Sequence, residues 1–396
     1  MSARPDPGGA AGGGAVPATS PATTDAEPRA AGLPTLIDVL RWRACEQPDR
    51  RTYTFLTDGE TDEACITNAE LDAKARAIAA VLRERGLGGE RALLLYPPGL
   101  DLIAAVFGCL YAGTVAVLAY PPDPGRLART LPRLLSIVAD ARPAVLLTTS
   151  AVAELGELAF GEDPGLKALP RLTTDDVDAA LSATWRDPGV DEDDLAILQY
   201  TSGSTADPRG VMLTHASLVD NLRRIQPSFG FRPESHMTLW LPPYHDMGLV
   251  GGILTPLYTG STVTLMSPAA FLRRPARWLR AISRSRATIG GAPNFAYDLC
   301  ARKVTPEDME GVDLGNWNLA FNGAETVRPE TLKRFADAFR RWGFRSEAFF
   351  PCYGLAETGL LISGGLMPPP SFRRHVALLG TAAPGPARPP DGTGVS

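Results

Sequence analysis

Short apolar segments that alternate with helical stretches constrain the fold of this chain more than any other feature. Strands are expected at 92–96, 115–119, 144–148, 195–200, 237–241, 262–266, 318–322 and 347–350. Helices are expected from Leu36, from Asn68 as N-cap to Gly86, from Leu100 to Tyr111 before Gly113, and over 218–225, 272–282 and 331–342. Such alternation is typical of an α/β fold with mostly parallel sheets flanked by helices, and 396 residues allow two or three lobes or domains.

Composition excludes several other classes of protein. The formal net charge of −5 lacks the basic excess that neutralising nucleic-acid phosphates requires, so no nucleic-acid partner is expected. The five cysteines are odd in number and lack CxxC or Cys/His spacing, which favours a reducing compartment and no metal cage. No apolar run approaches the ~20 residues that span a bilayer, and no basic-then-apolar leader opens the sequence. We therefore expect a cytoplasmic protein without a membrane span.

The two ends of the chain differ in composition from the part between them. Residues 1–33 are mainly Ala, Gly, Pro, Ser and Thr, whose burial cannot offset the entropy of ordering them, so we expect a disordered tail. Residues 371–396 carry no periodic apolar pattern and are expected to be an unstructured or truncated end. Between these ends, the folded domain is expected over 34–370, with the polar interval 160–192 as a surface excursion.

The strongest chemical signal is a loop rich in Ser, Thr and Gly, which lies within LQYTSGSTADPRGVMLTH at 198–215. Gly203 and Gly210 permit unusual backbone angles, and the hydroxyls and main-chain amides of such a loop can bind anionic oxygens. Arg209 adds a positive charge with forked donors. A flexible turn is the alternative, but the strand before the loop and a helix capped near Thr214 favour a phosphate loop. Its spacing differs from that of the GxxxxGK(S/T) loop of the P-loop enzymes.

These residues resemble motifs of the adenylate-forming superfamily, which includes acyl-CoA synthetases, luciferases and peptide-synthetase adenylation domains. YTSGSTADPRG at 200–210 is similar to its ATP-phosphate loop, and YGLAET at 353–358 to its adenine and magnesium motif. Further segments at 93–113, 240–254, 290–300 and 321–327 resemble the fatty acyl-AMP ligase branch. The resemblance runs from about Pro34 to Gly365 and implies a multi-lobed N-terminal adenylation domain that uses ATP and Mg²⁺.

The resemblance also implies roles for individual residues. The β- and γ-phosphates of ATP would be held by Thr201, Ser202, Gly203, Ser204, Thr205 and Arg209. One side of the adenine pocket would be lined by Asn322, Gly323, Ala324 and Glu325, while Tyr353, followed by Gly354, stacks on the base. Glu357 would coordinate magnesium, which prefers carboxylate and phosphate oxygens. His245 and Asp246 would lie where the acyl carboxylate meets the α-phosphate and act by position and electrostatics.

Each of these roles has a structural alternative. His245 could be a structural histidine, Tyr353 a core aromatic, and Glu357 a carboxylate that faces a helix dipole. The ordered set of motifs favours function, and His245 also stands in a loop directly after a strand, where ligands of α/β sheets bind. The other histidines are expected to be structural or to lie in the unpatterned end: His215, His236 and His375.

Two further segments allow two interpretations each. Arginines recur at helical spacing at Arg273, Arg277, Arg280 and Arg284. A solvated helix face is the simplest interpretation of this row, and docking of an acidic carrier protein is the alternative. The segment 290–300 would line an acyl tunnel by resemblance, whereas its composition indicates core.

The sequence departs from the family pattern in several places. Ala206 stands where the phosphate loop often has Gly, and Arg209 where many members have Lys. Ala356 replaces the Thr that is common in the wider superfamily, and this change is similar to the fatty acyl-AMP ligase pattern. The sequence stops at Ser396, before the ribose-binding Asp and the small C-terminal domain with a catalytic Lys that the family carries. We expect either a fragment or truncated gene, or completion by another chain.

The sequence therefore predicts ATP-dependent activation of a fatty acid to acyl-AMP, for transfer to an acyl carrier protein in polyketide or lipopeptide biosynthesis. An acyl-CoA synthetase is the neighbouring alternative. A peptide-synthetase domain is less favoured, because no Asp that would pair with a substrate amine can be identified. A catalytically dead remnant that binds nucleotide or a carrier protein is an alternative of a different class.

Overall fold

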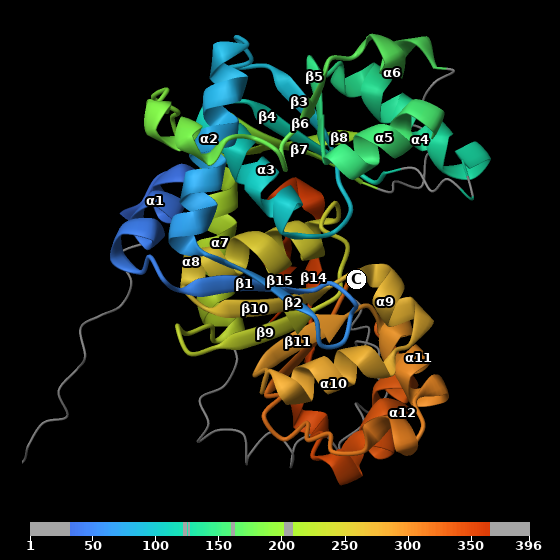
Figure 1. Ribbon diagram of the computed structural model, residues 1–396. Coiled ribbons are helices and arrows are strands. Elements are labelled where there is room, and N and C mark those ends of the chain that lie inside the picture. The colour runs from blue at the N-terminus through green and yellow to red at the C-terminus, as the bar shows by residue number, and fades with distance from the viewer. Residues whose placement is uncertain (1–31, 122–124, 126, 160–162, 202–208, 365–396) are drawn as a thin grey trace, which may run out of the picture.

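The computed structural model describes residues 32–121, 125, 127–159, 163–201 and 209–364. These residues form two lobes, each built on a mostly parallel sheet with flanking helices, and the lobes lie one above the other in Figure 1. The α/β fold expected from the sequence is confirmed. The tail predicted at 1–33 lies outside the described residues except for its last two positions, and the predicted end over 371–396 lies wholly outside them.

A sheet of six strands forms the upper lobe of Figure 1, in the order β6-β5-β3-β4-β7-β8. Its strands are β3 Arg91–Leu95, β4 Val115–Ala119, β5 Val145–Thr148, β6 Arg171–Thr173, β7 Leu195–Tyr200 and β8 Gly210–Thr214. All neighbours are parallel except β7 and β8. Alternate residues of β4 enter different clusters: Leu118 packs in the main core, and Val117 packs with Leu134 of the helix α4 (Leu127–Ala141). Both faces of this sheet are therefore covered at its centre, which explains why β3, β4 and β5 are almost wholly apolar.

A sheet of seven strands forms the lower lobe, in the order β13-β12-β11-β9-β10-β1-β2. Its strands are β1 Arg51–Leu56, β2 Glu63–Thr67, β9 His236–Leu239, β10 Thr262–Met266, β11 Ile289–Ala292, β12 Leu319–Asn322 and β13 Phe349–Pro351. All neighbours are parallel except β1 and β2. Fully buried aromatic side chains fill the core beside it, with Trp278 and Trp317 edge to face at 5.2 Å between ring centroids.

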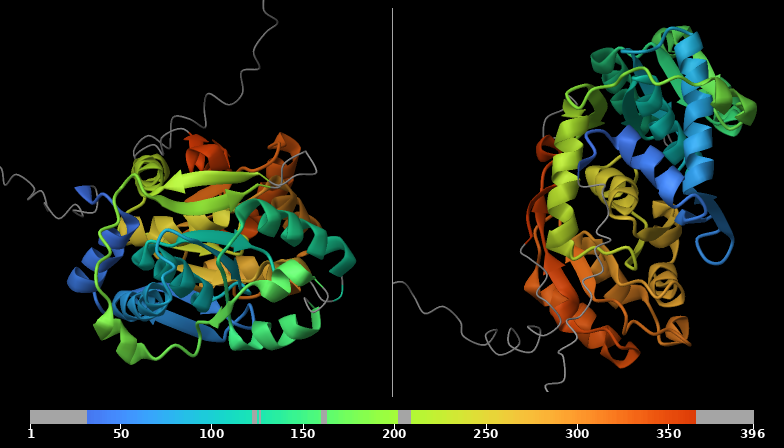
Figure 2. Two further views of the ribbon diagram at one scale, coloured as in Figure 1. Left: turned by 90° about the horizontal axis from the view of Figure 1, so that it is seen from above. Right: turned by 90° about the vertical axis from the view of Figure 1, so that its left-hand side faces the viewer.

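Helices flank the two sheets and connect their strands. The α-helices are α1 Leu36–Glu46, α2 Asn68–Glu84, α3 Leu100–Ala112, α4 Leu127–Ala141, α5 Ser150–Ala159, α6 Pro164–Ala168, α7 His215–Phe229, α8 Thr255–Thr259, α9 Pro268–Arg273, α10 Ala276–Arg284, α11 Asn294–Lys303 and α12 Pro329–Phe339. Shorter turns are η3 Ala179–Thr184, η5 Glu307–Met309, η6 Arg340–Trp342, η7 Ser346–Ala348 and η8 Ala356–Thr358, and η4 Met247–Leu254 is a π-helix. Figure 2 shows α7 running along one side of the molecule, beside the hairpin of β14 Tyr353–Gly354 and β15 Leu361–Ser363.

Every strand that the sequence predicts is present, although some differ by a few residues at their ends. The sequence missed β1, β2, β6, β8, β11, β14 and β15. The strand β8 lies between the phosphate loop and α7, where a direct entry into the helix was expected, and β6 lies within the expected surface excursion. Thr214 caps α7 as predicted, because its side chain accepts a hydrogen bond from the Ser217 N–H at 3.1 Å.

Several predicted helix boundaries differ from the structure, and two of these differences have a clear local cause. The helix expected over 272–282 is broken into α9 and α10, because Pro275 cannot continue the first helix and instead caps the second. The N-cap of α2 is Thr67 rather than Asn68, since Thr67 and Glu70 form a reciprocal capping box. The Asn68 side chain instead accepts a hydrogen bond from the Thr52 hydroxyl at 2.7 Å. Within the described residues, no helix is long and apolar enough to cross a membrane.

Candidate active site

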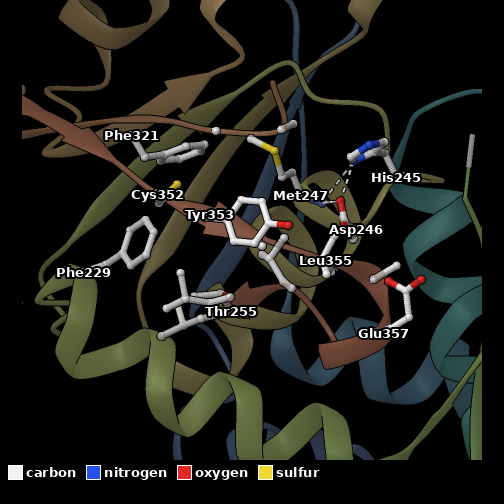
Figure 3. A pocket seen from close by; sticks show the side chains of 18 of the residues that line it. Phe229, His245, Asp246, Met247, Thr255, Phe321, Cys352, Tyr353, Leu355 and Glu357 are labelled. Carbon is white, nitrogen blue, oxygen red and sulfur yellow. Dashed lines mark hydrogen bonds and ion pairs between the residues drawn. The ribbon is translucent and has the colours of Figure 1, made fainter. Parts of the chain in front are cut away.

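A cavity of about 380 Å³ opens between the end of β7 and the ends of β9, β12 and β13. Its volume lies within the roughly 300–1,000 Å³ that small-molecule sites occupy. The carboxyl ends of parallel strands are where α/β sheets bind ligands. Figure 3 shows that the cavity has two chemically different ends, with His245, Asp246 and Glu357 at one and Phe229, Phe321 and Cys352 at the other.

The polar end is organised around His245 and Asp246. His245 Nδ1 lies 2.6 Å from Asp246 Oδ1, and the same oxygen accepts a hydrogen bond from the Met247 N–H at 2.7 Å. Asp246 thereby caps η4, a π-helix, and such helices often occur at functional sites. The side chain of Asp246 is 12% exposed and that of His245 is 47% exposed. Asp246 is thus held in place, while the imidazole that it orients reaches the cavity.

The hairpin of β14 and β15 carries Tyr353 and Glu357. Tyr353 is 57% exposed and lines the cavity, which contradicts the alternative of a core aromatic. Gly354 lets the two strands approach closely, because a Cβ at this position would lie 1.9 Å from the carbonyl oxygen of Leu360. Glu357 sits in the turn η8 between the two strands and is exposed at the polar end of the cavity.

The described residues fit a magnesium site in which a protein carboxylate shares the ion with phosphates of the ligand. Within the described ranges, no group of three or more His, Cys, Asp or Glu could form a cage around a metal ion. The exposed carboxylate of Glu357 fits Mg²⁺ instead, since this ion is commonly held by one or two carboxylates together with substrate phosphates and water. The donor set therefore agrees with a metal that enters together with a phosphate-bearing ligand.

The loop after β12 separates the predicted adenine residues into two groups. Gly323 and Ala324 line the cavity, and Ala324 has a φ of +67°, in the left-handed region that non-glycine residues rarely adopt outside special sites. Asn322 is fully buried and points its side-chain amide toward α11. Glu325 Oε1 accepts a hydrogen bond from the Phe295 N–H at 2.6 Å. The structure thus brings Gly323 and Ala324 to the cavity, and the adenine role of Asn322 and Glu325 stays a prediction.

The phosphate loop joins the antiparallel strands β7 and β8. Thr201 lines the cavity, and its carbonyl oxygen accepts a hydrogen bond from the Arg133 guanidinium of α4 at 3.3 Å. Arg209 is exposed at the other end of the loop. The remaining predicted phosphate ligands, Ser202, Gly203, Ser204 and Thr205, lie outside the described residues. Of this set, the structure places Thr201 at the cavity.

The apolar end of the cavity is a feature that the motifs did not reveal. It is lined by Ile225, Phe229, Phe231, Met237, Phe321, Cys352, Leu360 and Leu361. Phe229 and Phe321 meet edge to face at 5.9 Å between ring centroids. Burial raises the pKa of the Cys352 thiol to about 11, so the thiol stays neutral and adds no charge to this wall. Ile225 and Phe229 follow helical spacing on α7, a signal that indicates an apolar face without saying that a cavity adjoins it.

The segment 290–300, expected to line an acyl tunnel by resemblance, contributes no residue to this cavity. Tyr297 within it is fully buried and donates a hydrogen bond from its hydroxyl to the Phe321 carbonyl at 2.7 Å. This position agrees with the interpretation of the segment as core. A contact between the segment and an acyl chain stays a prediction.

Two of the other histidines lie away from the cavity, in structural positions. His215 is 1% exposed and its Nδ1 accepts a hydrogen bond from the Leu36 N–H at 3.3 Å. The ring of His236 lies between the hydroxyls of Thr262 and Thr264, at 2.7 and 2.9 Å. Burial lowers the pKa of each imidazole to about 4. His375 lies outside the described residues.

The row of arginines around α10 is bound largely within its own lobe. Arg277 pairs with Glu60 at 2.9 Å, Arg284 with Glu63 at 3.6 Å, and Arg280 donates to the Asp308 carbonyl at 2.7 Å. Side chains engaged in this way join α10 to η5 and to the β1–β2 hairpin. The pairing weighs against the alternative of a docking site for an acidic carrier protein.

Comparison with known proteins places this site in a family. The sequence matches the family described as AMP-binding enzyme over residues 40–386. The chain belongs to this family. It is 48% identical over 330 residues to the medium-chain-fatty-acid–acyl-carrier-protein ligase JamA of Moorena producens, a match that covers 83% of the chain and 56% of JamA. It is 37% identical over 354 residues to the long-chain-fatty-acid–AMP ligase FadD23 of Mycobacterium tuberculosis, covering 85% of the chain and 59% of FadD23.

Solved structures of AMP-binding enzymes agree with this assignment. A fatty acyl-adenylate ligase from L. pneumophila, in complex with acyl adenylate and pyrophosphate, superposes with a TM-score of 0.80 at 43% identity, covering 85% of the chain and 58% of the ligase. The adenylation domain of a keto acid-selecting peptide-synthetase module superposes with a TM-score of 0.74 at 24% identity, which shows a shared fold alone. The resemblance to the fatty acyl-AMP ligase branch is confirmed. The chain spans a little over half the length of the relatives that it matches.

Proposed function

We propose that this chain binds ATP and a fatty acid side by side and joins them as acyl-AMP, with release of pyrophosphate. The observation that carries the proposal is the single cavity with a polar end at Glu357 and an apolar end at Phe229. Acyl-AMP has the same division into a charged, aromatic nucleotide and an aliphatic chain. Relatives named as fatty-acid ligases support this assignment.

The chemistry requires positioning more than covalent participation by the protein. A carboxylate oxygen of the fatty acid attacks the α-phosphorus of ATP, the bond from that phosphorus to the bridging oxygen breaks, and pyrophosphate leaves with the electron pair. No net proton transfer is needed. The protein must therefore hold two anions together and offset their charge, which accounts for most of the catalysis in such transfers.

Residues around the cavity divide these tasks. Tyr353 would stack on adenine, and the backbone of Gly323 and Ala324 would border the base. Thr201 and Arg209, with the rest of the loop, would bind the β- and γ-phosphates. Glu357 would hold Mg²⁺, which neutralises phosphate charge when it is bound.

His245 would lie beside the reacting carboxylate. Its ring is oriented by Asp246, which is itself bonded to the Met247 N–H. When both of its nitrogens carry a proton, a ring fixed in this way donates one hydrogen bond to Asp246 and can donate the other to an oxygen that gains charge during the transfer, at no cost of reorganisation. Asp246 would act through the imidazole rather than on the substrate.

We further propose that an acyl carrier protein accepts the acyl group, as in the relative named for that activity. Transfer to coenzyme A is the alternative. The proposal includes the domain assignment, in which residues 34–370 form the N-terminal adenylation domain, and the cytoplasmic location expected from the sequence.

The direct test mixes the chain with ATP, MgCl₂ and fatty acids of different length, and follows acyl-AMP by mass spectrometry. The proposal predicts acyl-AMP with the unchanged chain and at least tenfold less with Glu357→Ala, on the order of what loss of a metal-site contact costs. Thr358→Ala, in the same turn, is the matched control and should retain product. Binding of ATP and fatty acid without product would favour the alternative of a nucleotide-binding remnant. Failure to bind either ligand would overturn the proposal.

A further inference from the structure

Asn221 of α7 makes two hydrogen bonds to one residue of the hairpin that carries Glu357. Its Nδ2 donates to the Leu361 carbonyl oxygen at 3.0 Å, and its Oδ1 accepts from the Leu361 N–H at 3.1 Å. Asn221 is 4% exposed, so water offers little replacement for these bonds. One carboxamide thus pairs with both backbone groups of Leu361, as a neighbouring strand would in a sheet.

Of the two strands of the hairpin, only the outgoing strand depends on α7 for support. Its incoming strand follows β13, which belongs to the seven-stranded sheet, and the Cys352 N–H donates to the Asn322 carbonyl at 2.9 Å. Its outgoing strand β15 pairs with β14 alone among the described strands. Leu361 on β15 is held from outside by Asn221 of α7, which lies beside the hairpin in Figure 2.

The turn between the strands is held tightly by its own hydrogen bonds. The Leu355 N–H donates to the Leu360 carbonyl at 3.0 Å, and the Gly359 N–H donates to the Ala356 carbonyl at 2.9 Å. Gly359 has a φ of +88°, and a Cβ there would lie 3.2 Å from the Asn221 Cβ. The turn is therefore held together against α7, and the position of Leu361 bears on that of Glu357.

The same helix also connects the hairpin with the phosphate loop. The strand β8 leaves the phosphate loop and leads directly into α7, and β8 contacts the turn η8 that holds Glu357. Ile225 and Phe229 follow Asn221 at intervals of four residues and line the apolar end of the cavity. One face of α7 thus contacts the hairpin and lines the apolar end of the cavity.

We propose that Asn221 is a positioning residue that sets the Glu357 carboxylate at the right distance from the phosphates of ATP, so that both can share one Mg²⁺. This inference rests on the proposed function, since it takes Glu357 as the magnesium carboxylate. Asn221 touches neither nucleotide nor metal, and its effect is specific to binding that depends on Mg²⁺.

The test measures ATP binding to the full chain by calorimetry, once with MgCl₂ and once with EDTA. The unchanged chain should bind ATP more tightly with MgCl₂. Asn221→Ala should reduce this magnesium-dependent gain about tenfold, the lower end of what loss of a metal site's outer hydrogen bonds costs, while ATP affinity in EDTA changes less than about twofold. Glu357→Ala should show the same pattern. Arg224→Ala, on the exposed side of α7, should keep the full gain.

A second variant separates positioning from folding. Asn221→Asp can still accept from the Leu361 N–H but cannot donate to the Leu361 carbonyl, and it is expected to lose part of the gain while keeping the volume of the side chain. If the folded variants keep the full magnesium-dependent gain in ATP affinity, the inference is overturned. It is also overturned if ATP affinity falls equally with MgCl₂ and with EDTA. An unchanged chain that does not bind ATP at all would overturn the proposed function itself, so the two failures can be told apart.

Discussion

Single residues in this protein owe their chemical state mainly to burial. The thiol of Cys352 is kept neutral at the apolar end of the cavity, and the imidazoles of His215 and His236 are kept neutral away from it. Burial disfavours the charged form of any such group, because the protein interior solvates charge poorly. The ring of His245, in contrast, is partly exposed and lies against the Asp246 carboxylate. The two histidines whose pKa is lowered by burial therefore lie outside the site.

The two structural histidines predict how stability depends on pH. Their pKa is lowered to about 4 in the folded chain, while the unfolded chain has the ordinary value of 6.5. The unfolded chain therefore binds more protons between these values, and their contribution to stability is complete above pH 6.5 and is lost as pH falls toward 4. For each pH unit of acidification in this range, each histidine should lower the free energy of unfolding by at most about 1.4 kcal/mol.

Urea unfolding at intervals between pH 7.5 and 5 measures this slope. His236→Gln and His215→Gln should each reduce the slope below pH 6.5 by about half of the histidine contribution, whatever their effect on stability at neutral pH. A slope that both substitutions leave unchanged would show that other groups cause the acid sensitivity.

At the scale of elements, a buried arginine joins two helices. Arg43 of α1 is 1% exposed and donates hydrogen bonds to the carbonyl oxygens of Leu257 and Tyr258, at 2.9 and 2.7 Å, in α8. Burial, together with the nearby charge of Arg50, lowers the pKa of Arg43 to about 10. These carbonyls lie at the C-terminal end of α8, where a cation is favourable and where the helix cannot pair them itself.

Arg43→Met is expected to lower the free energy of unfolding by about 3 kcal/mol, because it leaves two buried carbonyl oxygens without a donor. Arg41→Met is the matched control on the same helix. Arg41 pairs with Asp187 in an exposed ion pair, and its loss should cost less than about 1 kcal/mol. Chemical denaturation of both variants gives the comparison, and equal stabilities would contradict the role assigned to Arg43.

Uniform burial made some strands easy to predict from sequence patterns. The strand β4 is buried at every residue and stands out as an apolar run, whereas β2 and β8 are edge strands with largely exposed or half-exposed side chains. The strand β11 is buried but contains two glycines, IGGA, so only its first residue has the branched side chain that indicates a strand. When a strand is buried by residues far away in the sequence, a short segment of sequence does not reveal that burial.

The site shows the same division between local and distant information. His245, Tyr353 and Glu357 stand in compact motifs, so the sequence indicated each of them before the structure placed them around one cavity. Its apolar end combines α7, β9 and the β14–β15 hairpin, which are far apart in the chain. The hydrogen bonds between Asn221 and Leu361 join residues that are 140 positions apart and belong to no motif, so they could be found only in the structure.

At the scale of the whole molecule, the two lobes contribute different parts of one cavity. The six-stranded sheet brings Thr201 at the end of β7, and the seven-stranded sheet brings His245, Ala324 and Tyr353 after β9, β12 and β13. The helix α7 follows the phosphate loop and supplies part of the apolar wall. A ligand that fills both ends would therefore contact both lobes at once.

The most direct measurement of the central claim is the affinity of the chain for non-hydrolysable acyl sulfamates of adenosine, with acyl groups of two, six and ten carbons. If one cavity holds nucleotide and chain together, affinity should rise by about fourfold per methylene, the equivalent of ~0.8 kcal/mol for each buried CH₂, until the chain meets the aromatic wall at Phe229. Phe229→Ala should extend the length at which the rise stops. Equal affinities for all three lengths would contradict the account, because the apolar end would then not bind the acyl group.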